Sequence, residues 1–127
     1  MKKLIFKVIS LSSIIFLSSC SSSDNQFELI GNTDLTDGTM IYVLQADQNN
    51  QPYIKDSTSV QSNSFKFKGI SSTPQISYIQ VEGVNGYVLA ILENGDIKAD
   101  IYKDSISKSR VYGTKSNDDF IKYKAET

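Results

Sequence analysis

The stretch YIKDSTSVQSNSFKFKG, residues 53–69, decides the fold, because it places two extended segments on either side of a polar turn. In its second arm, strict alternation puts Phe65 and Phe67 on one face and two lysines on the other. The first arm carries β-branched residues, and Ser62 and Asn63 tolerate turn geometry. The stretch therefore predicts a β-hairpin whose two phenylalanines face the core.

Further strands of similar length precede and follow this hairpin. Alternating or apolar runs recur at intervals of about ten residues, with turn residues between them, at 27–31, 40–44, 77–82, 87–92, 97–102 and 110–113. The run 40–44 predicts a buried strand, and the run 87–92 predicts a strand buried on both faces. Together these runs predict an all-β fold, a mostly antiparallel β-sandwich or open barrel of seven to eight strands.

The end of the chain changes period and predicts a short C-terminal helix. Asn117 is a suitable N-cap, acidic residues fill the first turn, and lysines follow later, which complements the helix dipole. Phe120 and Tyr123 share one side of this helix. Packing of that side on the strands is expected of a self-sufficient domain, whereas an exposed apolar side is expected of a fragment that awaits a partner.

The beginning of the chain predicts an export signal. Lysines precede the apolar run 8–17, which is too short to span a bilayer. The run leads into Leu17-Ser18-Ser19-Cys20, which resembles the lipobox of bacterial lipoproteins, whose cysteine is acylated and becomes the first mature residue. Cys20 is the only cysteine of the chain, so it has no disulfide partner. The alternative is an ordinary secretory leader with a chance or structural cysteine.

A lipid anchor at Cys20 gives the chain four parts. We expect a lipoprotein signal peptide at 1–19, a flexible tether after the lipidated cysteine at 20–26, a β-sandwich domain at 27–114 and the short helix at 115–127. Two or more acyl chains attach a protein stably to a membrane, so the membrane is the first expected partner. Ser21, rather than Asp, follows the cysteine, which favours the outer membrane facing the periplasm.

The charge balance argues against nucleic acid as a partner. Removal of residues 1–19 deletes three of the thirteen basic side chains and none of the fourteen acidic ones, so the net charge falls from −1 to about −4. Nucleic-acid binding depends on neutralising phosphates with basic side chains. We therefore expect no nucleic acid to bind.

The residue types also restrict the chemistry. The chain has no histidine, which removes the commonest general base, the usual zinc ligand and the Ser-His-Asp and Cys-His arrangements. Asp56 with Ser57 is a conceivable catalytic pair, but these residues more often bond nearby backbone amides. Glu93 with Asp96 could pair or bind calcium, but Glu-Asn-Gly-Asp is typical of a turn, and the spacing of a calcium loop is missing.

The glycines do not add a cofactor site. Gly83, Gly86 and Gly95 follow turns and form no phosphate-binding pattern. We therefore expect no catalytic residue, no cofactor and no metal, and hence no enzymatic activity.

Several of these pieces occur in a fixed order along the chain. They are Phe27-Glu28-Leu29-Ile30-Gly31, Asp37-Gly38 before Ile41-Tyr42-Val43, Asp56-Ser57-Thr58, Phe65-Lys66-Phe67-Lys68-Gly69, Leu92-Glu93-Asn94-Gly95-Asp96, and Gly113-Thr114 before Asn117-Asp118. This order, over about residues 27–124, resembles the β-rich domain of unknown function that precedes the thioredoxin-like domain in lipid-anchored thiol-disulfide oxidoreductases of Bacteroidetes-type bacteria.

The resemblance implies an envelope location and a role in docking a partner, with a thioredoxin-like protein as one candidate. Redox activity does not carry over, because a chain with one cysteine has no Cys-x-x-Cys dithiol. Two hypotheses follow. The first is a lipid-anchored β-domain that binds or positions another envelope component. The second is a truncated or split N-terminal portion of a periplasmic thiol-disulfide oxidoreductase that lacks its catalytic thioredoxin domain.

Overall fold

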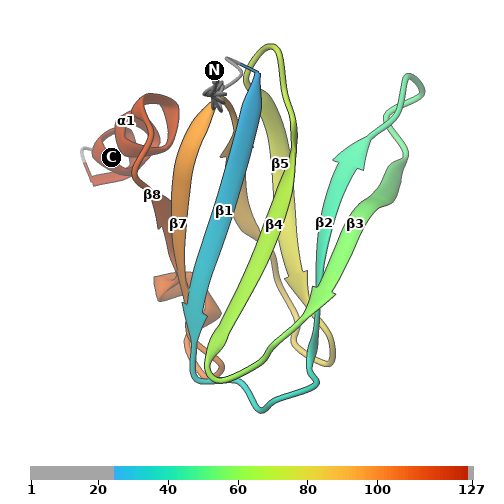
Figure 1. Cartoon of the computed structure of the whole chain (residues 1–127), viewed down its shortest axis with the longest axis vertical. Helices are drawn as coiled ribbons and strands as arrows, with labels where there is room; N and C mark the ends of the chain where they lie inside the picture. The colour runs from blue at the N-terminus through green and yellow to red at the C-terminus, as the bar shows by residue number, and fades with distance from the viewer. Residues whose placement is uncertain (1–24, 126–127) are drawn as a thin grey trace, which may run out of the picture.

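The computed structural model describes residues 25–125 and contains eight strands, one 3-10 turn and one helix (Figure 1). In chain order the elements are β1 (Gln26–Thr33), β2 (Met40–Ala46), β3 (Pro52–Ser59), β4 (Ser64–Ile70), β5 (Gln75–Val81), β6 (Val88–Leu92), β7 (Gly95–Ile101), η1 (Ile106–Lys108), β8 (Arg110–Tyr112) and α1 (Lys115–Ala125). Within 25–125 no helix is both long and apolar enough to cross a membrane.

The strands form two four-stranded sheets that pack face to face. The first sheet has the order β4-β1-β7-β8, and the second has the order β3-β2-β5-β6. All strand pairs are antiparallel except β1 with β7, which run parallel. The edge strands β6 and β8 contact each other, and α1 contacts both. The predicted all-β class, mostly antiparallel and with a short C-terminal helix, is confirmed.

The predicted hairpin over residues 53–69 is wrong beyond its turn. Ser62 and Asn63 do form a tight turn, with φ of 54° and 65°, as a hairpin turn requires. Only the bridge between Gln61 and Ser64 follows from it, because β3 pairs with β2 while β4 pairs with β1. The side chain of Val60 is fully buried, and here the chain crosses from one sheet to the other at the end of the sandwich (Figure 1).

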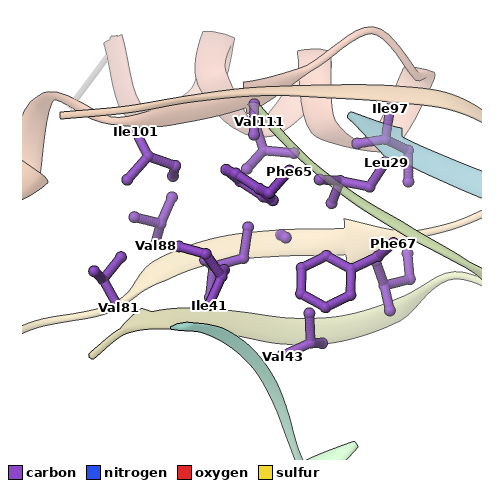
Figure 2. Packing of buried hydrophobic residues seen from close by; sticks show 14 of the residues in the cluster. Leu29, Ile41, Val43, Phe65, Phe67, Val81, Val88, Ile97, Ile101 and Val111 are labelled. Atoms are coloured by element: carbon purple, nitrogen blue, oxygen red, sulfur yellow. The ribbon is translucent and has the colours of Figure 1, made fainter. Parts of the chain in front are cut away.

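The core lies between the inner faces of the two sheets (Figure 2). Phe65 and Phe67 are both buried, as their alternation predicts, and their rings meet edge to face with centroids 6.0 Å apart. Leu29 and Ile97 come from the neighbouring strands of the same sheet, and Ile41 comes from the opposite sheet. Alternation in β1, β4 and β7 therefore gives the correct inner face for each strand.

Two phenylalanines of this sheet cover glycines on the neighbouring strand. In the β1–β4 register, Gly31 is opposite Phe65 and Phe27 is opposite Gly69. A β-carbon built on Gly31 would lie 2.1 Å from the ring of Phe65, and one on Gly69 would lie 2.8 Å from the ring of Phe27. Each ring thus occupies the space that a side chain would need, which explains why these two strand positions are glycine.

The hairpin of β2 and β3 turns away from β4 at its far end (Figure 1). The register between the two strands shifts between Val43 and Leu44, where one extra residue is inserted into β3. Such a bulge bends a strand and increases its twist. Beyond the bulge the hairpin leaves the body of the sandwich, and its tip is fixed by Asp47, whose carboxylate accepts the amides of Asn49 and Gln51.

Candidate functional site

The Asp56-Ser57 pair is part of the surface of β3. Both side chains are exposed, and the amide of Ser57 donates to the carboxylate of Asp56 at 2.8 Å. This local bond is the ordinary habit of aspartate that the sequence favours.

Glu93 and Asp96 have separate environments. Glu93 follows β6 and accepts hydrogen bonds from the amide of Ser116 at 2.8 Å and from its hydroxyl at 2.7 Å. Asp96 is exposed on the outer face of β7. Among residues 25–125 there is no group of three or more histidine, cysteine, aspartate or glutamate side chains that could hold a metal ion.

The Glu93 carboxylate anchors the first turn of α1. Burial raises the pKa of this carboxyl, while hydrogen bonds from Thr114, Ser116 and Asn117 lower it, and its pKa lies below the ordinary value of 4.5. The bonds to the first-turn amides also place a negative charge at the positive end of the helix. Glu93, in the connection between the two sheets, thus fixes the start of the C-terminal helix.

Asn117 is not the N-cap that its sequence context predicts. The helix begins at Lys115, and the carbonyl of Thr114 accepts the first helical bond from the amide of Asp118. Asn117 is instead buried, with 2% of its surface exposed, and its side chain reaches β6. There its Oδ1 accepts a hydrogen bond from the amide of Ile91, and its Nδ2 donates to the carbonyl of Ile91. Nδ2 also donates to the hydroxyl of Thr114 at 2.8 Å.

The apolar side of α1 is only partly covered. Phe120 and Ile121 are half-buried and line a hollow of about 300 Å³ together with residues of β6, η1 and β8. Tyr123 in the last turns is 63% exposed. The helix is therefore held at its start by polar contacts, and its far end carries an open aromatic side chain.

The outer face of the β4-β1-β7-β8 sheet is charged. Its outward side chains include Glu28, Ile30, Lys66, Lys68, Asp96, Lys98, Asp100 and Arg110. Glu28 lies 3.4 Å from Lys66, and Asp100 lies 3.6 Å from Arg110. This face has the mixed charge of an ordinary solvated surface. A wide hollow of about 560 Å³ at its end is lined by Glu28 and Asp96, which are opposite each other in the β1–β7 register, and by Lys68, whose Nζ lies 3.9 Å from the carboxylate of Glu28.

The residues that the registers place on the outer face of the β3-β2-β5-β6 sheet are uncharged, and at the margin of this face Glu82, just past β5, accepts the amide of Met40 at 3.0 Å. The burial patterns and registers place the following residues on it: Met40, Tyr42 and Leu44 of β2, Ile54, Ser57 and Ser59 of β3, Ile76, Tyr78 and Gln80 of β5, and Leu89 and Ile91 of β6. We call these residues, with Tyr87 just before β6, the uncharged face.

Several members of the uncharged face are open to solvent. The exposed fraction is 57% for Ile54, 61% for Ile76, 40% for Tyr78 and 57% for Tyr87. The rings of Tyr78 and Tyr87 meet edge to face, with centroids 6.1 Å apart. They line a hollow of about 310 Å³ together with residues of the projecting hairpin, namely Leu44, Gln45, Ala46, Asn50 and Pro52. Contiguous exposed apolar surface of this kind marks interaction sites in monomeric proteins.

The uncharged face was not predicted from the sequence. The runs 40–44 and 87–92 were expected to be buried, and 87–92 on both faces, because nearly every residue in them is apolar. In the structure one side of each run enters the core and the other, including Leu44 and Leu89, is only half-buried on the uncharged face. In a fold of two layers only one side of each strand faces the core, so apolar residues on both sides of a strand could have indicated an exposed apolar face.

The sequence of this chain matches a known protein family. The family described as "Domain of unknown function (DUF4369)" matches residues 12–120, which is most of the chain. The chain belongs to this family. No curated protein and no solved structure is significantly similar to this DUF4369 domain. Cys20, the expected lipidation site, lies outside the residues that the structure of the DUF4369 domain describes.

Proposed function

We propose that this DUF4369 domain is a lipid-anchored protein of the bacterial cell envelope, that it binds or positions another envelope component, and that it has no catalytic activity. The lipid anchor is Cys20, and the proposed location is the outer membrane facing the periplasm. The observation that carries the binding function is the uncharged face, on which Ile54, Ile76 and Tyr87 are all more than half exposed.

Several features support a protein as the bound component. Tyrosine is enriched at protein interfaces, and charged residues are depleted from their centres. The uncharged face combines both features, because Tyr42, Tyr78 and Tyr87 lie on it and no charged side chain does. The resemblance to domains that precede a thioredoxin-like domain adds a thioredoxin-like protein to the candidate partners.

The binding proposal is tested by tyrosine labelling in intact envelopes. Tyr87 and Tyr123 are 57% and 63% exposed, so a free domain would be modified at similar rates at both. With rates normalised to those of the unfolded chain, a bound partner is expected to protect Tyr87 and leave Tyr123 reactive. Equal labelling of the two tyrosines in the envelope would refute binding through this face.

The lipid anchor is tested separately. Cys20→Ala removes the thiol to which the acyl chains would be attached, so the variant is expected to leave the detergent phase in phase partitioning. The wild type is expected to carry added lipid mass. Unchanged partitioning of the variant, with no lipid mass on the wild type, would end the lipoprotein proposal.

The absence of catalysis is tested with insulin as a disulfide substrate. A chain with one cysteine cannot cycle between a dithiol and an intramolecular disulfide. We expect no insulin reduction by the full chain above that of Cys20→Ala. Turnover that depends on Cys20 would contradict the proposal.

The alternative function is that of a detached front portion of a thiol-disulfide oxidoreductase. The observation that favours it is Tyr123, a large aromatic side chain that is 63% exposed near the end of α1, the element that would lead towards a following domain. A thioredoxin fold with a Cys-x-x-Cys pair, encoded immediately downstream, would support this alternative. A different gene there would remove it.

A further inference from the structure

The end of the sandwich at which β1 begins carries an exposed apolar side chain beside the point where the chain arrives from Cys20. Ile70, the last residue of β4, is 70% exposed, the largest exposed fraction among the large apolar side chains of residues 25–125. We propose that Ile70 enters the membrane surface, so that the domain stands on the bilayer by this end. The inference rests on the lipid anchor of the proposed function and adds a contact made by the folded domain itself.

The anchor limits the distance between this end and the membrane. Asn25, the first residue that the structure describes, is five residues after Cys20. A chain spans at most about 3.6 Å per residue, so Asn25 lies within about 18 Å of the acylated cysteine whatever path the chain takes. The start of β1 is therefore held beside the bilayer, whichever way the rest of the domain points.

Ile70 is fixed next to this point. The β1–β4 register pairs the first residue of β1 with Ile70, and the amide of Ser71 donates to the carbonyl of Asn25 at 2.6 Å. Ser71 is buried, and its hydroxyl donates to the carbonyl of Thr73 at 2.7 Å and lies 3.0 Å from that of Leu92. These bonds hold the beginning of the β4–β5 connection at the place where the anchor restrains the domain.

The surroundings of Ile70 suit a lipid surface. The connection from β4 to β5, residues 71–74, has no charged side chain, and residues 72–74 are exposed. An uncharged segment with an exposed isoleucine can enter the boundary between headgroups and acyl chains without removing a charge from water. Lys68, on the same outward face two residues before Ile70, is 69% exposed, so its ammonium can stay among the headgroups.

The charges near this end are balanced, so the apolar contact decides the orientation. Lys66 and Lys68 offset Glu28 and Asp96 on the neighbouring strands, and an anionic lipid surface neither attracts nor repels this set strongly. One isoleucine alone binds a membrane weakly. The anchor makes the contact intramolecular, however, and modest affinity is then sufficient.

This contact gives the domain a direction. β1 runs the length of the sandwich from the end that carries Ile70 (Figure 1). At about 3.3 Å per residue, its last residue, Thr33, lies about 23 Å from its first, and in a standing domain it is correspondingly farther from the bilayer. The uncharged face then extends away from the membrane, where a partner can reach it.

The test places a polarity-sensitive fluorophore at three positions of the full chain. Ile70→Cys, Ile30→Cys and Tyr102→Cys each introduce the only free thiol once Cys20 is acylated. Ile30 lies on the same outward face farther along β1, and Tyr102 follows β7 at the opposite end. The purified proteins are added to vesicles of phosphatidylethanolamine and phosphatidylglycerol that carry a nitroxide quencher near the headgroup end of the acyl chains.

We expect quenching to fall in the order of positions 70, 30 and 102, with blue-shifted emission at position 70 alone. Equal quenching at positions 70 and 30 would mean that the β4-β1-β7-β8 sheet lies flat on the bilayer, which would overturn the standing orientation. Acylated protein without quenching at position 70 would overturn the inference and leave the anchor intact. Absence of lipid mass from the same preparations would overturn both.

A pair of substitutions tests the part played by Ile70 itself. A fluorophore on Ser72→Cys, in the exposed connection, reports whether this end touches lipid. Ile70→Asp puts a charge at the contact and is expected to abolish quenching of this fluorophore. Ile30→Asp, at an outward isoleucine that is 41% exposed on the same sheet, is expected to leave it unchanged. Thermal unfolding controls for loss of fold, and equal quenching in the two folded variants would overturn the contact at Ile70.

Discussion

The side-chain amide of Asn117 pairs with the backbone of Ile91 as a neighbouring strand would. The amide of Ile91 donates to Oδ1 at 2.9 Å, and Nδ2 donates to the carbonyl of Ile91 at 2.8 Å. Ile91 is in β6, an edge strand whose outward backbone groups have no strand partner in the described sheet. One side chain of α1 therefore attaches the helix and also blocks part of an edge that could otherwise pair with another chain.

We expect Asn117→Ala to loosen the attachment of α1. The substitution leaves both backbone groups of Ile91 without their partner, and an unsatisfied buried polar group costs about 1–3 kcal/mol. Amide hydrogen exchange should become faster over Lys115–Ala125 and at Ile91. Lys122→Ala, at an exposed position of the same helix, is the control. Unchanged exchange in Asn117→Ala would show that the helix is held by other contacts.

The docking of α1 should also weaken in acid. The pKa of Glu93 is lower in the folded protein than its ordinary value of 4.5, so its carboxylate stabilises the fold fully above that pH. This contribution is lost as the pH falls below 4.5 and through the lowered folded pKa. Thermal unfolding of the wild type and of Glu93→Gln over this range measures the effect. A difference between them that stays constant with pH would contradict it.

Gly31 should not tolerate a side chain. Its β-carbon would lie 2.1 Å from the ring of Phe65, so Gly31→Ala must displace a buried phenylalanine. We expect overpacking to destabilise the domain by about 1–3 kcal/mol. Phe65→Leu shortens the opposing side chain, so the double variant should lose less than the sum of the two single losses in denaturant unfolding. Additive losses would mean that the two residues do not compete for this space.

The two sides of β4 should respond very differently to truncation. Phe67→Ala removes a buried ring and is expected to destabilise the domain by about 3–5 kcal/mol. Lys66→Ala should cost less than about 0.5 kcal/mol, since its ion pair with Glu28 is at the surface and its side chain is 55% exposed. Denaturant unfolding compares the two. Equal losses would be inconsistent with the orientation of β4.

The sequence predicts which face of a strand is buried better than it predicts which strands pair with it. Alternation at Phe65 and Phe67 depends only on the pleat of one strand, so it identifies the buried face correctly. Pairing depends on contacts with distant residues, and the turn at Ser62 and Asn63 is compatible both with a hairpin and with a crossing between sheets. Burial of Val60 favours the crossing between the sheets, and that burial depends on residues from the whole core.

The candidate site is harder to predict for the same reason. Asn117 has the residue type of an N-cap, and only the position of β6 reveals that its amide pairs with Ile91. The runs that contain Leu44 and Leu89 are apolar enough for a strand buried on both faces. Whether the second face is covered depends on the number of layers in the fold, which no local pattern encodes.

The parallel pairing of β1 with β7 has a consequence for the folding of this chain. β1 lies between β4 and β7, and Phe27 is opposite Gly95, so one edge of the first strand remains unpaired until most of the chain has been synthesised. Pairing between distant segments slows folding, and an open strand edge can recruit other chains in the meantime. Until β7 joins the sheet, the folding chain therefore keeps this strand edge open, and we expect it to be prone to aggregate at that stage.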